Sequence, residues 1–372
     1  MLDAYLEMTE GPLVILSSGE GAEMSTQNPL LFRQGRAIRV IPARHIYTLP
    51  PLLRAIEVLR FSRLLRNADA FHIHGADTMD GSQAACSLAR LSLCNLAVKQ
   101  GVRTEILGFS WQEDPPAVVS DAMVALSRKM HIKPRDPLSA RRLESAGACN
   151  IKPVSDMAFS LTREMAPPQD VVSWIMDCRS RGNEFVVLNV SGLIARKMDQ
   201  TVEISHVVAE AHSNGLSVLF LPHVIRHGDD DLLAVLEAYS SYGTESNLCV
   251  TELLTPAEVR FITSRAKVTI TGRMHLSILS LSAGTPAIAL DTAGKVEGLF
   301  ELFGMRQFVV RAEPGFGREI GLHLSEALLK NSQMRNQIAT VMETVRVSSR
   351  ANFSDLATAR DFGLAEEGEC AS

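Results

Sequence analysis

The sequence predicts an α/β protein of two domains, each built on a parallel sheet. Its 372 residues exceed the roughly 100–200 residues of one ordinary domain. Short β-branched or apolar runs alternate with helical stretches, and this alternation is typical of a parallel sheet. Residues 161–183 contain Pro167-Pro168, a pair that disfavours helix and strand interiors, so we place a linker there. The predicted domains are residues 1–165 and 180–365, followed by a small acidic tail, 366–372, that should fray.

The elements of both domains follow from the same alternation. In the first domain it predicts strands near 13–16, 37–41, 70–74, 104–109 and 122–125, with helices near 51–66 and 83–100. In the second domain it predicts strands at 184–192, 216–223, 248–254, 266–272, 285–291 and 307–312, and helices near 198–214, 229–242, 256–265, 274–283 and 296–303. Tandem βα domains usually bind ligands in the cleft between them, at the carboxyl ends of the strands. We therefore expect functional side chains in strand-to-helix loops.

Composition excludes several classes of function. The net charge of −5, with 21% charged residues, predicts no nucleic-acid binding. Six cysteines without a C-x-x-C pair indicate reduced thiols in a cytosol and no zinc site. No carboxylate pair has the spacing of metal ligands, so we expect no metal. The first residues lack the basic region of a secretory signal, and no run approaches the ~20 apolar residues of a membrane span. We expect a cytoplasmic protein, which can act at the inner face of the membrane.

Arg273 and His275 are the most informative candidates. They follow the predicted strand and Gly272, in the first turn of a helix that ends at Gly284, a residue suited to the left-handed conformation. A helix N-terminus favours anions, so two cationic side chains there oppose local preference, which is typical of a functional site. The structural alternative is that Arg273 pairs with a carboxylate and His275 is an ordinary half-buried histidine.

Other strand ends also carry polar side chains. The loops after the strands at 184–192, 216–223 and 285–291 contribute Arg196, Lys197, His223, Arg226, His227, Lys295 and Glu297, and the strand end near 74 contributes His74, Asp77 and Asp80. Each of these alone is more often structural than functional. Their shared position at carboxyl ends of strands points to one site.

Several segments together resemble the polysaccharide pyruvyl transferase family. The stretch TGRMHLSILSLSAGTPAIALDTAGKVEGL has a strand, an R-x-H helix start, G-x-P and K-x-x-G, like the C-terminal signature of the family. KPRDPLSARRLESAG and VSDMAF resemble its R-D-x-x-S-x-x-x-L segment and the aspartate-containing strand end that follows. FHIHGADTMDG and LGFSWQEDP stand where the family has a glycine-rich strand end and its next strand. The resemblance covers most of residues 65–305, but a family tetrapeptide N-x-G-D is absent and Ala76 replaces a common glycine.

The resemblance implies transfer of pyruvate from phosphoenolpyruvate to two hydroxyls of a sugar, forming a ketal. It also implies two Rossmann-like domains facing a cleft, as in GT-B glycosyltransferases, with the acceptor in the first domain and the donor in the second. Phosphoenolpyruvate is then a co-substrate, no cofactor is needed, and the partner is a carbohydrate acceptor that can be lipid-linked. The sequence does not give the oligomeric state.

Roles follow for the candidate residues. Arginine suits both anionic groups of the donor, and a histidine titrates near neutral pH, so His275 and Arg273 are the expected catalytic pair. We expect His275→Ala to abolish turnover and Arg273→Ala mainly to weaken donor binding. Further candidates are Arg196, Lys197, His223 and Lys295 for the donor and Asp77, Asp80 and His74 for the acceptor.

Alternatives remain open at this point. Arg135 and Asp136 fit either an internal pair or a substrate contact, and Asp156 is equally ambiguous. A GT-B glycosyltransferase with a nucleotide-sugar donor would use a helix N-terminus for the diphosphate and an acid such as Glu297 for the ribose. The missing N-x-G-D motif also fits an inactive carbohydrate-binding relative.

Overall fold

A computed structural model gives the fold of the chain in residues 11–17, 30–33, 36–43, 46, 51–76, 79, 81, 83–225, 230–292 and 294–353. The predicted acceptor residues Asp77 and Asp80, together with Arg226, His227 and the tail 366–372, lie outside these described residues. Two compact units make up the chain, Met1–Met157 with Ser348–Ser372, and Ala158–Val347.

The first unit holds two three-stranded sheets. One is parallel and has the order β4 (Ala70–Ala76), β5 (Arg103–Phe109) and β6 (His131–Pro134). In the other, β3 (Arg36–Pro42) pairs in parallel with β1 (Leu13–Ser17) and antiparallel with β2 (Leu30–Arg33), which the sequence does not predict. Its helices are α3 (Pro51–Leu65), α4 (Ala84–Lys99), α5 (Ala117–Ser127) and α6 (Pro137–Ser145), followed by the 3₁₀ turn η1 (Met157–Ser160) at the unit boundary.

The strand predicted at 122–125 is wrong, because these residues lie in helix α5. Val119, Met123 and Leu126 are buried at helical spacing, against the core of the parallel sheet. A short apolar run does not by itself distinguish a strand from a buried helix. Here the spacings of four and three between the buried residues Val119, Met123 and Leu126 identify the segment as a helix.

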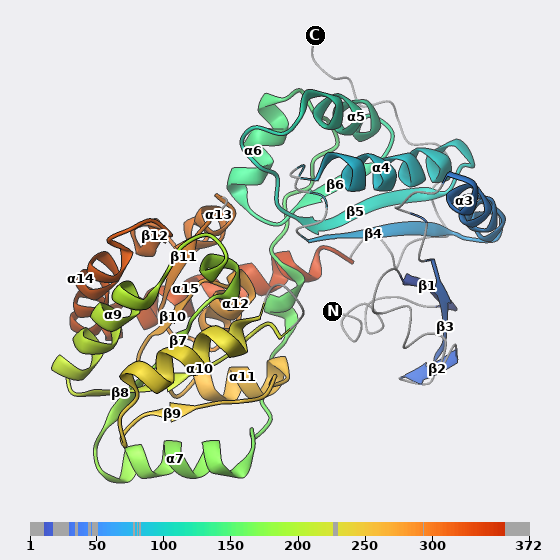
Figure 1. Cartoon of the computed structure of the whole chain (residues 1–372). Coiled ribbons are helices and arrows are strands. Elements are labelled where there is room, and N and C mark those ends of the chain that lie inside the picture. Colours follow the sequence, from blue (N-terminus) through green and yellow to red (C-terminus); the bar gives the residue numbers. More distant parts are fainter. Residues whose placement is uncertain are drawn as a thin grey trace. The chain divides into compact units, whose positions relative to one another are not determined.

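The second unit is a six-stranded parallel sheet with helices on both faces (Figure 1). Its strand order is β12-β11-β10-β7-β8-β9, formed by β7 (Glu184–Asn189), β8 (Leu216–Phe220), β9 (Leu248–Cys249), β10 (Thr269–Thr271), β11 (Ala287–Asp291) and β12 (Val309–Arg311). The helices are α7 (Gln169–Ser180), α8 (Gly192–Ala195), α9 (Thr201–Ser213), α10 (Asp231–Tyr242), α11 (Pro256–Thr263), α12 (Met274–Ser282), α13 (Val296–Glu301), α14 (Phe316–Leu329) and α15 (Asn331–Arg350), with the 3₁₀ turn η2 (Arg306–Phe308).

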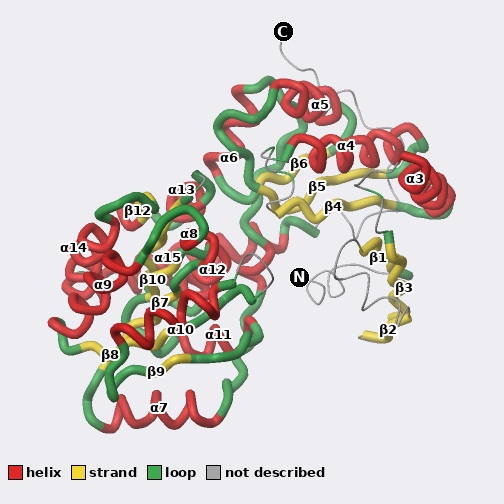
Figure 2. Tube along the Cα trace, in the orientation of Figure 1, coloured by secondary structure: helices red, strands yellow, loops and turns green. Residues whose placement is uncertain are grey.

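Two hydrophobic clusters cover the two faces of this sheet. Along β7, Val186 and Leu188 join the cluster that includes α9 and α14, while Phe185 and Val187 join the one that includes α7 and α11. This alternation is the period of two of a strand buried on both faces. Figure 2 shows the strands of this unit enclosed by helices.

The segment predicted as a linker, 161–183, contains helix α7. The proline pair stands directly before it, with Pro168 as the N-cap residue. Proline is tolerated at a helix start because the first N–H groups have no partner inside the helix. The division of the chain into two compact units falls between Met157 and Ala158.

The chain returns to the first unit at Ser348, within α15. There, the buried ammonium of Lys133 donates to the carbonyl of Asn352 at 3.1 Å, and Asn352 Nδ2 donates to the carbonyl of Ser155 at 2.9 Å. These bonds attach the end of α15 to the sheet of the first unit.

The described residues include cysteines with free thiols, and their helices can be compared with the length of a membrane span. Four cysteines, Cys86, Cys94, Cys178 and Cys249, are free. No helix in the described part of the chain has both the length and the apolar character needed to cross a bilayer.

Candidate active site

The candidate site lies at the carboxyl edge of the second unit's sheet, where the strand order reverses. From β7 the chain proceeds to β8 and β9 on one side, and then returns to β10 on the other side. The loops after β7 and β10 therefore diverge, and such a switch point is where parallel sheets bind ligands. Arg273 and His275 follow β10 at this point.

Asp231, the first residue of α10, connects the loops around the switch point. Its carboxylate is fully buried and accepts hydrogen bonds from the backbone N–H of Gly192 at 2.8 Å, of Val224 at 3.1 Å and of His223 at 3.2 Å. Asn189 Nδ2, at the end of β7, donates to the same carboxylate at 3.0 Å. One acceptor thus fixes the loops after β7 and β8.

The guanidinium of Arg273 binds the same carboxylate. Through this contact, Asp231 also holds the loop after β10. Its Nη2 lies 2.6 Å from Asp231 Oδ1, and its Nε lies 3.1 and 3.2 Å from the two oxygens. The Arg273 side chain is only 10% exposed. The carboxylate pairing that the sequence left open as an alternative is therefore present. Burial and three short contacts make this a fixed guanidinium, whose charge is offset by Asp231.

Thr271 fixes the backbone just before this arginine. Its Oγ1 accepts from the N–H of Arg273 at 2.9 Å and donates to Asn189 Oδ1 at 3.0 Å. Arg273 has extended backbone and is the N-cap residue of α12, which runs to Ser282 before Gly284 adopts a φ of 80°. The predicted helix start and the left-handed glycine are confirmed.

Two glycines let the loops approach closely. A Cβ on Gly272 would lie 2.7 Å from Ser191 Cβ and 2.9 Å from Ile194 Cδ1, and a Cβ on Gly192 would collide with the backbone of Asp230. Both sites therefore exclude larger side chains. Beside Gly272, the buried hydroxyl of Ser191 has no hydrogen-bond partner among the residues that the structure describes.

His223 and His275 lie close enough for the charge of His275 to act on His223. Burial, together with the charges of His275 and Arg273 and against that of Asp231, lowers the pKa of His223 to about 4. His223 is therefore neutral near pH 7, and its buried Nδ1 has no hydrogen-bond partner in the described part of the chain. His275, in the first turn of α12, is exposed. The site therefore contains a neutral imidazole, that of His223, and an exposed imidazole that a ligand can reach, that of His275.

The remaining predicted donor residues lie on neighbouring loops. Arg196 and Lys197 are exposed directly after α8, which begins at Gly192, and Lys295 is the half-buried N-cap residue of α13. His74, predicted for the acceptor, is exposed near the end of β4 in the first unit. The structure thus brings Arg273, His223 and His275 together.

Asp231, Asn189 and Ser191 were not among the predicted site residues. The signal for Asp231 was the run Asp229-Asp230-Asp231 before an apolar periodic stretch, which indicates a capped helix start. Nothing in the sequence reveals that its carboxylate turns inward. Asn189 and Ser191 stand at a strand end, the position where functional side chains gather.

The segment around Arg135 is an internal network of the first unit. Arg135 Nη1 lies 2.9 Å from Asp156 Oδ2, and its Nε donates to Ser110 Oγ at 2.9 Å. Asp136 caps α6 by accepting from the N–H of Ser139 at 2.7 Å. Arg135, Asp136 and Asp156 are all buried. Of the two alternatives left open by the sequence, the internal pair is present.

Two hollows flank the second unit's sheet away from Arg273. One of about 430 Å³ lies beyond β11 and β12 and is lined by the carboxylates of Asp291, Glu297, Glu313 and Glu319, with Arg311 among them. The N-terminus of α14 borders it, but Glu203 accepts there from the N–H of Gly315 at 2.6 Å and of Gly317 at 2.7 Å. This groove is acidic, and its helix end is already occupied.

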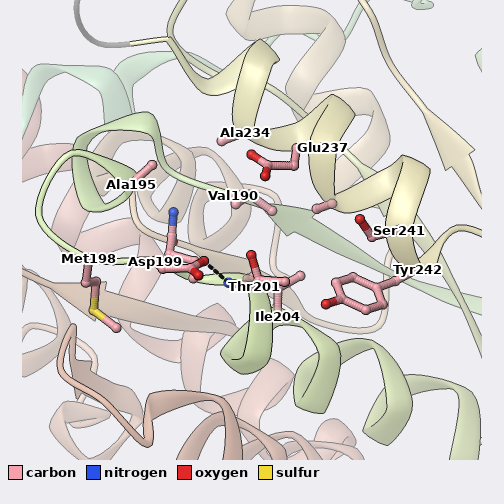
Figure 3. A pocket seen from close by; sticks show the side chains of 12 residues that line it. Val190, Ala195, Met198, Asp199, Thr201, Ile204, Ala234, Glu237, Ser241 and Tyr242 are labelled. Atoms are coloured by element: carbon pink, nitrogen blue, oxygen red, sulfur yellow. Dashed lines mark hydrogen bonds between the residues drawn. The ribbon is translucent and has the colours of Figure 1, made fainter.

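The other hollow, of about 120 Å³, lies between the start of α9 and α10 (Figure 3). Glu237, Ser241 and Tyr242 of α10 face Asp199, whose carboxylate accepts from the N–H of Thr201 at 2.8 Å. Its lining contains no cationic side chain, so it offers nothing to an anion. Across the described residues, no three His, Cys, Asp or Glu side chains come together as metal ligands would.

Solved structures with the same fold cover nearly the whole chain. A trehalose-6-phosphate synthase from E. coli, bound with UDP-2-fluoro glucose, matches with a TM-score of 0.59 at 12% identity, over 95% of this chain and 94% of that one. A putative UDP-N-acetylglucosamine 2-epimerase from Listeria monocytogenes matches with 0.55 at 12%, over 92% and 94%. A co-structure of MnaA with UDP from S. aureus matches with 0.54 at 11%, over 95% and 100%. These similarities show the fold alone, and it is the GT-B-like, Rossmann-like class that the sequence predicts.

Family membership comes from the sequence model of the polysaccharide pyruvyl transferases. A search of curated proteins gives no match. The family model matches residues 30–294, which include Asp231, Arg273 and His275. On this match, the chain belongs to the polysaccharide pyruvyl transferase family.

Proposed function

We propose that the protein transfers the pyruvyl group of phosphoenolpyruvate to two hydroxyls of a sugar, in a polysaccharide or its precursor. The products are a cyclic ketal and inorganic phosphate. The observation that carries this proposal is the exposed His275 beside the neutral His223, above a guanidinium fixed by Asp231 at the sheet's switch point.

The charges around this point suit a donor with a carboxylate and a phosphate. The N–H groups at the start of α12, the fixed Arg273 and the exposed Arg196 and Lys197 can each meet an anion. Asp231, the carboxylate in the cluster, is fully buried and bound to Arg273. A donor that approaches His275 is not repelled by an exposed acid of this cluster.

The reaction needs one proton donor near neutral pH. His275 protonates the methylene carbon of the donor, and a sugar hydroxyl attacks the resulting cationic carbon. A second hydroxyl displaces the phosphate and closes the ketal. Of the two hydroxyl protons, one restores His275 and the other leaves with the phosphate. The half-buried His223 stays neutral beside His275.

The structural neighbours raise the alternative of a nucleotide-sugar donor, because two of them are bound with UDP compounds. A diphosphate would need unpaired N–H groups at a helix end, but Glu203 occupies those of α14, and the groove beside it is acidic. Glu297, the candidate for a ribose, pairs with Arg306 at 3.0 Å. These contacts argue against a nucleotide sugar in the groove beside α14.

We further propose a cytoplasmic protein that needs no cofactor beyond its co-substrate. The acceptor is a carbohydrate, and a lipid-linked sugar would fit a site at the inner face of the membrane. His74, with Asp77 and Asp80, remains the proposed acceptor side.

Incubation of purified protein with phosphoenolpyruvate and a panel of glycans tests the proposal. We expect phosphate release together with a pyruvyl mass increase on one glycan. His275→Gln should abolish both, because glutamine cannot donate the proton. The His275 side chain is exposed, so the variant should still fold. His323→Gln on α14 is the matched control and should keep full activity. Release of nucleoside diphosphate from a nucleotide sugar, or sugar binding without donor binding in calorimetry, would overturn the proposal.

A further inference from the structure

Helix α3 has two apolar faces, and the first unit buries only one of them. Phe61 and Leu65 are each 3% exposed and pack in a cluster with Leu93 and Ala97 of α4. The Phe61 ring meets Phe71 of β4 edge to face, with 4.9 Å between centroids. Figure 1 shows α3 beside α4 in this unit. This inner face anchors the helix.

The outer face carries a second apolar stripe. Leu52, Ile56 and Leu59 follow one another at helical spacings of four and three, and their side chains are 73%, 41% and 59% exposed. Leu53 lies next to them at 40%. Positions i, i+4 and i+7 share one face of a helix. Single exposed leucines are ordinary, but a continuous stripe on one helix indicates a surface that binds something.

Arginines surround this stripe. Arg63 lies four residues after Leu59, on the same face, and Arg60 and Arg66 flank it. All three are exposed, and no ion pair within the described residues engages them. Glu57 is the single acid of α3. The protein as a whole is acidic, with a net charge of −5, so this basic face is a local feature.

We propose that this outer face of α3 docks on an anionic membrane surface. The leucine and isoleucine side chains would enter the level of the headgroups, and the arginines would reach lipid phosphates. A second copy of the chain fits less well, because two such faces would bring like charges together. A lipid surface supplies both the apolar layer and the negative charge. The proposal does not depend on the donor, and it gives a place for a lipid-linked acceptor.

Vesicle sedimentation of the full chain tests it. We expect binding to vesicles of phosphatidylcholine mixed with phosphatidylglycerol, weak binding to phosphatidylcholine alone, and loss of binding in high salt. Each arginine near an anionic surface contributes about fivefold in affinity. The charge variant is Arg60→Gln/Arg63→Gln/Arg66→Gln, and it should bind roughly 100-fold less tightly. The apolar variant is Leu52→Gln/Ile56→Gln/Leu59→Gln, and it should lose binding.

Matched controls change exposed residues elsewhere. Leu322 and Leu329 on α14 are 74% and 86% exposed, and Arg179 and Arg181 are exposed at the end of α7. Their glutamine variants should bind vesicles as the unchanged protein does. Both α3 variants should keep phosphate release with a soluble acceptor, so a failure of docking is distinguishable from a failure of the proposed reaction.

Three results would overturn the proposal. They are equal binding to neutral and anionic vesicles, α3 variants that bind as well as the unchanged protein, and a dimer in sedimentation velocity that the apolar variant converts to a monomer. The last result would make the face an interface between copies of the chain.

Discussion

Arg273 and Asp231 should be coupled in stability as well as in activity. From sequence alone, Arg273→Ala should mainly weaken donor binding. In the structure it also leaves a fully buried carboxylate without its cation, so the second unit should lose stability. The informative perturbation is a double-mutant cycle of Arg273→Ala and Asp231→Asn.

The contacts set the expected magnitude. Arg273 makes three contacts of 2.6 to 3.2 Å with a carboxylate that is 0% exposed. Removal of one partner from a buried pair costs about 3–5 kcal/mol. Asp231→Asn also turns an amide NH₂ toward N–H donors, because both carboxylate oxygens accept backbone bonds. The double variant should be about 2 kcal/mol more stable than the sum of the single losses predicts.

A urea titration that reports only the second unit measures this cycle. The chain has two tryptophans, Trp111 in the first unit and Trp174 in the second. In a Trp111→Phe background, fluorescence comes from Trp174, whose ring lies 5.3 Å from that of Phe185. Arg273→Lys, which keeps the charge but not the fork, should lose less stability than Arg273→Ala.

A coupling below about 0.5 kcal/mol would refute this reasoning, because sites that do not interact are additive to that level. An Arg273→Ala protein with unchanged urea midpoint and reduced donor affinity would restore the simpler binding role.

Three further predictions concern packing, capping and pH. Gly272→Ala should lower the unfolding free energy by about 1–3 kcal/mol and reduce phosphate release, since its Cβ would meet Ser191; an unchanged melting curve would contradict this. Glu203→Gln should lower the melting temperature by a loss of about 1 kcal/mol, because a neutral amide caps the α14 N–H groups of Gly315 and Gly317 less well, and calorimetry measures it. Burial, with the charges of Arg103 and Lys133, lowers the pKa of His72 to about 4 against the opposing charge of Glu105. Between pH 6.5 and 4 the unfolded chain therefore binds a proton that the folded chain does not, so stability should fall as pH falls through this range by about 3 kcal/mol. Urea midpoints across that range should show a shallower fall in His72→Gln; an identical slope would remove the assignment.

The strands and helices of the second unit follow closely from its apolar periodicity. Each predicted strand contains the observed one, because strands buried on both faces form continuous apolar runs such as VVL in β7. The ends are less exact: β9 has only two residues, Leu248–Cys249, within the predicted run 248–254. Helices α14 and α15 were not predicted, although α15 is 20 residues long.

The first unit is less readable from sequence. Strand β6, of four residues, contains Lys133, which looks like a surface residue but is 0% exposed. It is buried because Glu105 lies 3.1 Å away and the carbonyl of Asn352 accepts from its ammonium. Burial alone would raise the pKa of Glu105, but its bonds with His131 and Lys133 hold it at about 2. Pairing over such distances in sequence is not encoded in local pattern.

The candidate site divides in the same way. Its position at strand ends and its R-x-H helix start were predictable, because both follow from topology and local residue types. The role of Asp231 was not, because it depends on where three loops converge. A charged residue in a run of acids is normally solvated, and only the fold turns this one inward.

The sharing of one carboxylate by three backbone amides has a dynamic consequence. The N–H groups of Gly192, His223 and Val224 all donate to Asp231, so a displacement of this carboxylate breaks the bonds of both loops at once. Hydrogen exchange at these amides should therefore report a single opening free energy, although they belong to two different loops. The loops after β7 and β8 would then lose their arrangement in one cooperative event, and donor binding would slow exchange at all three amides equally.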